Sequence, residues 1–269
     1  MNRKRAKRRR RRRNTVIVIV LIAVLAAVLV PYLTERGIPV FMYHCVADEP
    51  RGGDENLYLR PAQLEEELKF LSDNGYTSLF SDEYEKAYSV DKPVILTFDD
   101  GYEDNYLEMF PLLRKYNMKA TIFVVAAYVG KPDYLKDYQI KEMVKSGLVS
   151  IQSHTNNHID LSSADRETVD KEFRDSCAAL AKISGKNVTT LSYPGGYFDS
   201  EVLDEAKRYF TYCYAIDTNE YSKDNHYEIS RGGVFRNTTL ESFEIAIKTY
   251  SQSRIYRELL KFKHKYFDK

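Results

Sequence analysis

Short apolar runs rich in β-branched residues alternate with longer amphipathic stretches along most of the chain. The runs that predict strands lie at residues 39–43, 94–98, 120–125, 149–152, 189–193 and 212–216, with a weaker one at 229–235. The stretches that predict helices lie at residues 61–74, 105–116, 135–145, 166–184 and 200–208. This alternation is typical of parallel strands joined by crossover helices, so we expect one α/β domain.

A different pattern precedes this domain. Residues 16–30 form an unbroken apolar stretch, and residues 31–33 extend it to the length of a bilayer-spanning helix. Basic residues crowd its N-terminal side, and such a flank favours the cytoplasm. We therefore expect a basic cytoplasmic tail at 1–14, a transmembrane signal anchor at 15–33 and an extracytoplasmic domain at 34–269. A cleavable signal peptide is the alternative, although no small-x-small cleavage site follows the apolar run.

The overall charge conceals this asymmetry. The 269 residues include 40 Lys and Arg and 39 Asp and Glu, which gives a net charge of +1. Ten of the basic residues lie between positions 3 and 13, so the rest of the chain carries 30 basic and 39 acidic residues. An acidic domain argues against nucleic-acid binding. The three cysteines, Cys45, Cys177 and Cys213, are far apart and predict small buried apolar residues rather than a disulfide framework.

Polar clusters follow four of the predicted strands directly. They are Met-Tyr-His at 42–44, Asp-Asp-Gly at 99–101, Ser-His-Thr-Asn-Asn-His at 153–158 and Tyr-Pro-Gly-Gly at 193–196. The carboxyl ends of parallel strands share one face of an α/β fold, and active sites form there. We therefore expect these clusters to meet.

Two of the clusters contain the residue types of a metal site. His154 and His158 are four positions apart, which lets both imidazoles face one point, and two imidazoles with one carboxylate suit a zinc-like ion that keeps open positions. Of the adjacent Asp99 and Asp100, one carboxylate can bind the ion while the other accepts a proton. Taken singly, Asp-Asp-Gly is also an ordinary turn signal, and an isolated histidine pair is often incidental.

Together, these motifs resemble those of a known family. Residues 97–102 (Thr-Phe-Asp-Asp-Gly-Tyr), 153–158 and 193–196 are similar in order and spacing to the three motifs of the polysaccharide deacetylases of carbohydrate esterase family four, the NodB homology family. The likeness covers about residues 38–250. It implies a distorted (β/α) barrel with seven or eight strands, and the resemblance to deacetylases implies that the protein is a hydrolase.

The resemblance also implies roles for individual residues. Asp100, His154 and His158 would hold a divalent ion, zinc first, with cobalt, manganese or nickel as alternatives. Asp99 would be the general base for a water that attacks the acetamide carbonyl. Tyr193 and a backbone N–H near Gly195 would face the substrate and its oxyanion.

The chain departs from the family at two positions. Ser192 stands where many members have the arginine that orients the base, so we hypothesise that Arg231 contacts Asp99 instead. No histidine matches the family's general acid, which leaves His44, His226 or water at the metal as alternatives. His44 either lines the site or caps a strand.

The expected activity is removal of N-acetyl groups from a glucosamine-containing cell-wall or extracellular polysaccharide, either peptidoglycan or poly-N-acetylglucosamine. One alternative is an esterase that removes O-acetyl groups from a polysaccharide. Another is a catalytically silent wall-binding protein of the same fold, although a binding groove would not need a complete metal set. The expected partners are the acetylated polysaccharide and the membrane, with no nucleic acid.

Overall fold

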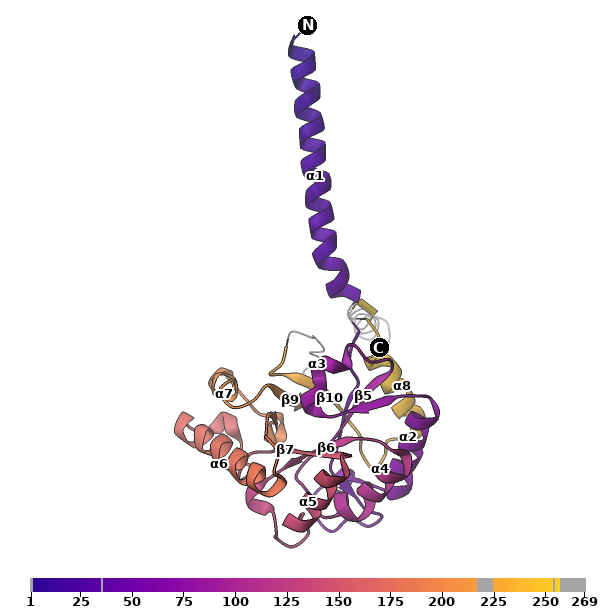
Figure 1. The fold of residues 1–269 in the computed structure, drawn as a ribbon, viewed down its shortest axis with the longest axis vertical. Coiled ribbons are helices and arrows are strands. Elements are labelled where there is room, and N and C mark those ends of the chain that lie inside the picture. The colour runs from indigo at the N-terminus through magenta and orange to yellow at the C-terminus, as the bar shows by residue number, and fades with distance from the viewer. Residues whose placement is uncertain (1, 35, 217–224, 254, 257–269) are drawn as a thin grey trace. The chain divides into compact units, whose positions relative to one another are not determined.

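The computed structural model describes residues 2–34, 36–216, 225–253 and 255–256 (Figure 1). The chain divides into two compact units, one formed by Met1–Gly37 with Gln252–Lys269 and the other by Ile38–Ser251. The first unit contains helix α1 (Asn2–Thr34). None of the helices in the described part of the chain is long and apolar enough to cross a membrane, so the expected anchor at 15–33 is not supported.

The second unit is built on a closed barrel of seven parallel strands. These are β1 (Val40–Tyr43), β5 (Pro93–Phe98), β6 (Ala120–Val124), β7 (Val149–Ser153), β8 (Thr190–Ser192), β9 (Tyr212–Ile216) and β10 (Ile229–Gly233). Their order is β1-β10-β9-β8-β7-β6-β5, and β5 pairs with β1 to close the barrel. Strand β4 (Thr77–Leu79) adds to β5, and a separate pair joins β2 (Cys45–Val46) to β3 (Tyr58–Leu59). The predicted (β/α) barrel is confirmed.

Helices surround the barrel (Figure 1). They are α2 (Pro61–Asp73), α3 (Tyr84–Ala87), α4 (Phe110–Tyr116), α5 (Asp137–Ser146), α6 (Arg166–Ser184), α7 (Ser200–Ala206) and α8 (Leu240–Tyr250). Local sequence sets their limits: α6 begins where the Asp165 side chain accepts a hydrogen bond from the Thr168 N–H and ends at Gly185, whose φ is 68°. A π-helical turn (Asn105–Met109) precedes α4.

The strand register places the polar clusters at one end of the barrel. Tyr43, the last residue of β1, pairs with Phe98, the last residue of β5, so His44 and Asp99 leave the barrel side by side. Ser153 at the end of β7 pairs with Leu191 of β8. The strands are almost wholly buried because helices cover the barrel, as expected for a parallel sheet. All three cysteines are free; Cys45 and Cys213 are buried and Cys177 is half-buried.

Candidate metal centre

Asp100, His154 and His158 converge at the carboxyl ends of β5 and β7. One possible ligand atom from each lies within 4.8 Å of the others. The Oδ1 atom of Asp100 is 3.4 Å from Nε2 of His154 and 3.3 Å from Nε2 of His158. A carboxylate with two imidazoles is a ligand set of catalytic zinc sites, which keep a further position open for water or substrate.

The surroundings of the two histidines fit a metal ion. Nδ1 of the buried His154 lies 2.8 Å from the carbonyl oxygen of Ser192, to which it donates, so the lone pair of Nε2 faces Asp100. Such an outer hydrogen bond commonly fixes the tautomer of a metal-binding histidine. Burial lowers the pKa of His154, which keeps it neutral, whereas the hydrogen bond with Asp100 raises the pKa of His158. A bound cation would replace the proton shared by Asp100 and His158.

Several residues at this centre have a backbone conformation that residues other than glycine rarely adopt. Asp100, Thr155 and His158 all have positive φ angles, of 71°, 63° and 58°. Non-glycine residues in this region are uncommon, and they concentrate at functional sites. The following Gly101 has a φ of 76°, and a Cβ there would lie 3.0 Å from Cγ1 of Val124. The turn after β5 therefore depends on glycine to present Asp100.

Asp99, directly after β5, is buried and is held by Arg231 from β10. Nη1 and Nη2 of Arg231 donate to the two carboxylate oxygens of Asp99 at 2.7 and 2.8 Å, and both residues are buried. Ser192 Oγ donates to Asp99 at 3.0 Å and accepts from Arg231 at 2.8 Å. Thr97 Oγ1 accepts from Nη1 of Arg231 at 3.0 Å. The hypothesised contact between Arg231 and Asp99 is thus present, with a bidentate geometry.

This arrangement keeps Asp99 ionised. Burial raises the pKa of Asp99, but the positive charge of Arg231 and its hydrogen bonds to the carboxylate lower it by more, so the pKa lies well below its usual range. An ionised carboxylate next to the three possible metal ligands is chemically able to accept a proton from water.

The structure separates the two candidate general acids. His44 follows β1 and interacts electrostatically with both Asp99 and Asp100, and its Nδ1 is buried without a hydrogen-bond partner among the described residues. His226, in contrast, lies at the amino end of β9: its ring contacts Tyr212, the first residue of that strand, and its carbonyl accepts from the Cys213 N–H. His226 is therefore at the opposite end of the barrel from the histidine pair, which removes it as the acid.

The expectation for Tyr193 needs correction. Its side chain is completely buried, its ring stacks on Phe198 and its hydroxyl donates to the Tyr227 carbonyl at 3.1 Å. Its backbone N–H donates to the Tyr214 carbonyl. Tyr193 is thus a packing residue. Gly195 is exposed in the turn after it, with a φ of 61°.

Two hydroxyl groups that the sequence motifs do not single out, those of Ser192 and Thr97, also belong to this site. Both hydroxyls complete the hydrogen bonds around Arg231 and Asp99. The available signal was a polar residue within a strand that is otherwise apolar, since buried polar groups need partners.

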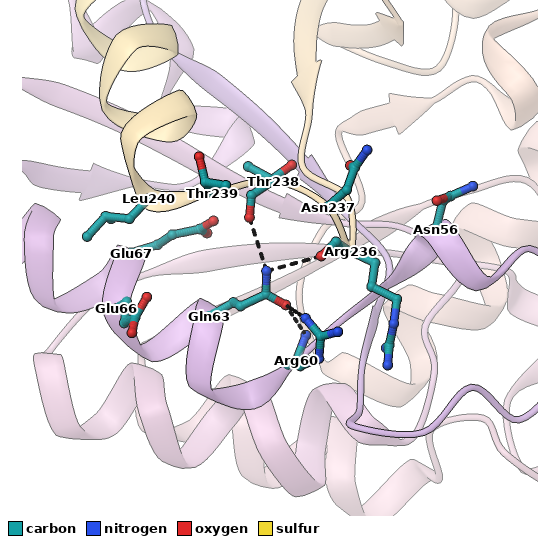
Figure 2. Close-up of a pocket in the computed structure, with 10 residues that line it drawn as sticks. All are labelled: Asn56, Arg60, Gln63, Glu66, Glu67, Arg236, Asn237, Thr238, Thr239 and Leu240. Carbon is teal, nitrogen blue, oxygen red and sulfur yellow. Dashed lines mark hydrogen bonds between the residues drawn. The ribbon is translucent and has the colours of Figure 1, made fainter.

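A separate polar pocket of about 580 Å³ contains none of the predicted site residues. Figure 2 shows Gln63 at its centre, donating to the carbonyls of Arg236 and Thr238 at 3.1 and 3.0 Å. Glu67 also lines it and accepts a hydrogen bond of 2.8 Å from the buried hydroxyl of Tyr43. Burial raises the pKa of Glu67 to about 8.

Comparisons with known proteins agree on one family. A family profile described as polysaccharide deacetylase matches residues 86–212. The crystal structure of BC0361, a polysaccharide deacetylase from Bacillus cereus, is 33% identical, covers 79% of this chain and 69% of its own, and has a TM-score of 0.75.

Two relatives are similar in sequence. YxkH of Bacillus subtilis is 35% identical over 176 residues, covering 64% of this chain and 61% of YxkH. The poly-β-1,6-N-acetyl-D-glucosamine N-deacetylase of Staphylococcus aureus is 28% identical over 171 residues, covering 57% of this chain and 59% of the enzyme. The chain thus spans about three fifths of the length of these curated relatives.

Proposed function

Because the chain belongs to the polysaccharide deacetylase family, whose members are hydrolases, we propose that it removes N-acetyl groups from a glucosamine-containing polysaccharide. The observation that carries this proposal is the convergence of Asp100, His154 and His158 next to an ionised Asp99. Three possible metal ligands beside an ionised carboxylate that is not one of them are what hydrolysis of an amide by activated water requires.

The residues divide the work of the reaction. A divalent ion held by Asp100, His154 and His158 would supply Lewis acidity to the acetamide carbonyl and lower the pKa of water. Asp99 accepts the proton of the attacking water, since it is ionised and adjacent. Arg231 fixes the orientation of Asp99 through its two parallel hydrogen bonds.

His44 is the proposed proton donor to the departing amine. Among the described residues it is the histidine beyond the metal ligands that interacts with both aspartates. Asn105 fixes the backbone at this position by donating to the His44 carbonyl at 2.9 Å. The proton passes to the nitrogen as the carbon–nitrogen bond breaks, giving acetate and a free amine.

The substrate proposal draws on the relative from Staphylococcus aureus, whose name specifies poly-β-1,6-N-acetyl-D-glucosamine. Peptidoglycan is the second N-acetylated candidate. The same residues would also hydrolyse an O-acetyl ester, which is more reactive than an amide.

The proposed activity is tested by acetate release from poly-β-1,6-N-acetylglucosamine, peptidoglycan and acetylated xylan, using the full chain with added zinc. We expect acetate from at least one of the two N-acetylated polymers and a loss of at least ~100-fold in His154→Ala. His226→Ala is the matched control, because this histidine lies at the other end of the barrel, and it should retain activity. Acetate from xylan alone would make the protein an esterase, and none from any polymer would reject the proposal.

The extracytoplasmic location remains a proposal from the sequence alone. The ten basic residues before the apolar stretch at 16–30 support it. Protease treatment of intact cells should digest the domain if it lies outside the cytoplasmic membrane and spare it if it lies within.

A further inference from the structure

A buried carboxylate holds the loop between the two histidines without touching either. Glu172 lies on α6 and is only 5% exposed. Its Oε2 accepts from the backbone N–H groups of Asn156 and Asn157 at 2.8 and 2.7 Å, and its Oε1 accepts from the side-chain amide of Asn157 at 2.6 Å. All three hydrogen bonds end on residues between His154 and His158.

These bonds complete the hydrogen bonding of the loop. The remaining backbone N–H groups donate to acceptors elsewhere: that of His154 to the Val124 carbonyl, that of Thr155 to Ser153 Oγ and that of His158 to Thr155 Oγ1. Every N–H from position 154 to 158 is therefore paired, and Glu172 alone accepts two of the five.

The loop needs such support because its conformation is strained. Thr155 and His158 have φ angles of 63° and 58°, and for a β-branched residue such as Thr155 this region is a genuine outlier. Conformations of this kind persist only when surrounding contacts impose them. Helix α6 supplies a second contact one turn further on, where Ser176 Oγ lies 2.8 Å from Ser153 Oγ.

We propose that Glu172 is a positioning residue that sets the spacing of His154 and His158 for metal binding. The inference rests on the proposed metal site and adds to it a residue outside the motifs that identify the family. Without the Glu172 acceptors, the loop can relax toward ordinary φ angles and carry His158 away from Asp100. Loss of outer contacts of this kind typically weakens metal affinity by 10- to 100-fold.

The test is the affinity of the full chain for Co²⁺, followed by its visible absorption, together with the thermal unfolding temperature of the metal-free protein. We expect Glu172→Gln to weaken Co²⁺ binding by about 10- to 100-fold. Glu172→Asp keeps the negative charge, but its shorter side chain moves the carboxylate oxygens away from Asn156 and Asn157. This variant should therefore weaken Co²⁺ binding as well. Glu167→Gln is the matched control, because it removes an exposed acid from the same helix.

The outcomes separate this inference from the proposed function. If the wild type binds no Co²⁺, the metal site itself is rejected. If the wild type binds and Glu172→Gln binds equally well, or is only less stable, the positioning role is overturned. If Glu172→Asp binds like the wild type, the effect is one of charge and the role is again overturned. Should these variants fail to fold, Asn157→Ala removes one of the three bonds at an exposed position, and an unchanged affinity there would overturn it.

Discussion

At the residue scale, Asp99 combines burial with a negative charge. Its charge is compensated by Arg231, which is completely buried and donates through both terminal nitrogens. The other polar groups around the pair, Ser192 and Thr97, leave few hydrogen-bonding positions unfilled. Such a pair is costly to break, because removing one partner leaves an uncompensated charge in the interior.

Replacement of Arg231 tests this pairing. Arg231→Met should destabilise the domain by about 3 to 5 kcal/mol, as measured by urea unfolding. It should also raise the pKa of Asp99, because burial then acts without the opposing guanidinium. The acid limb of the pH profile of kcat/KM would move to higher pH, since Asp99 would take up a proton earlier as the pH falls. Arg231→Lys keeps a positive charge beside Asp99 and should shift the acid limb by less. An unmoved limb in Arg231→Met would contradict the assigned role of Arg231.

The protonation of Glu67 makes the free energy of unfolding depend on pH, with a loss of stability as the pH rises. Its pKa is about 8 in the folded protein, mainly because of burial, against about 4.3 in an unfolded chain. The folded state thus binds the extra proton, so this stability is fully present below about pH 4.3 and is lost as the pH rises through about 8.

Glu67→Gln removes this titration and can keep the hydrogen bond from Tyr43. At pH 9 the variant should be more stable than the wild type by ~1 to 3 kcal/mol, and the difference should shrink toward pH 5. Denaturant unfolding at both pH values measures it. The exposed Glu108→Gln serves as the control and should show no such trend. An equal difference at the two pH values would show that Glu67 does not titrate in this range.

At the scale of elements, the apolar runs predicted the barrel well because each strand is buried on both faces. All seven predicted strands are present, and β9 and α6 match their predicted bounds. The strand ends also located Asp100, His154 and His158 together, since parallel strands deliver their carboxyl ends to one face. Strand β4 and helix α3 were missed because three or four residues are too few to show a period.

What sequence could not give was the direction of a side chain after a strand ends. Tyr193 follows β8 as Asp99 follows β5, yet Tyr193 turns inward onto Phe198. His226 precedes the late strand closely in sequence but lies by Tyr212 at the amino end of the barrel. Both outcomes depend on tertiary packing rather than on local pattern.

The turn after β5 offers a test at this scale. Gly101→Ala places a methyl group 3.0 Å from Val124 Cγ1 in a backbone conformation with a φ of 76°. Gly130→Ala is the matched control, because its φ is 85° and nothing lies within 4 Å of the added carbon. We expect the control to lose about 1 kcal/mol of stability and Gly101→Ala to lose more, with weaker zinc binding as well. Equal losses, measured by thermal unfolding and zinc titration, would show that the contact with Val124 is unimportant.

At the scale of the whole barrel, closure brings the first and last strands together, because β1 pairs with β10. Arg231 and Asp99 are 132 positions apart, and they meet because β1 pairs with both β5 and β10. The site therefore draws on the first, second, fourth, fifth and last strands of the barrel in chain order, and the fifth, β8, contributes Ser192. The site should therefore form only when the whole domain is folded.

The most direct measurement is the zinc content of the purified full chain after equilibration with zinc and removal of the excess. We expect one zinc ion per chain in the wild type and in His226→Ala, and none in His154→Ala. Zinc absent from the wild type, or retained in full by a folded His154→Ala, would contradict the assignment of Asp100, His154 and His158 as a metal site.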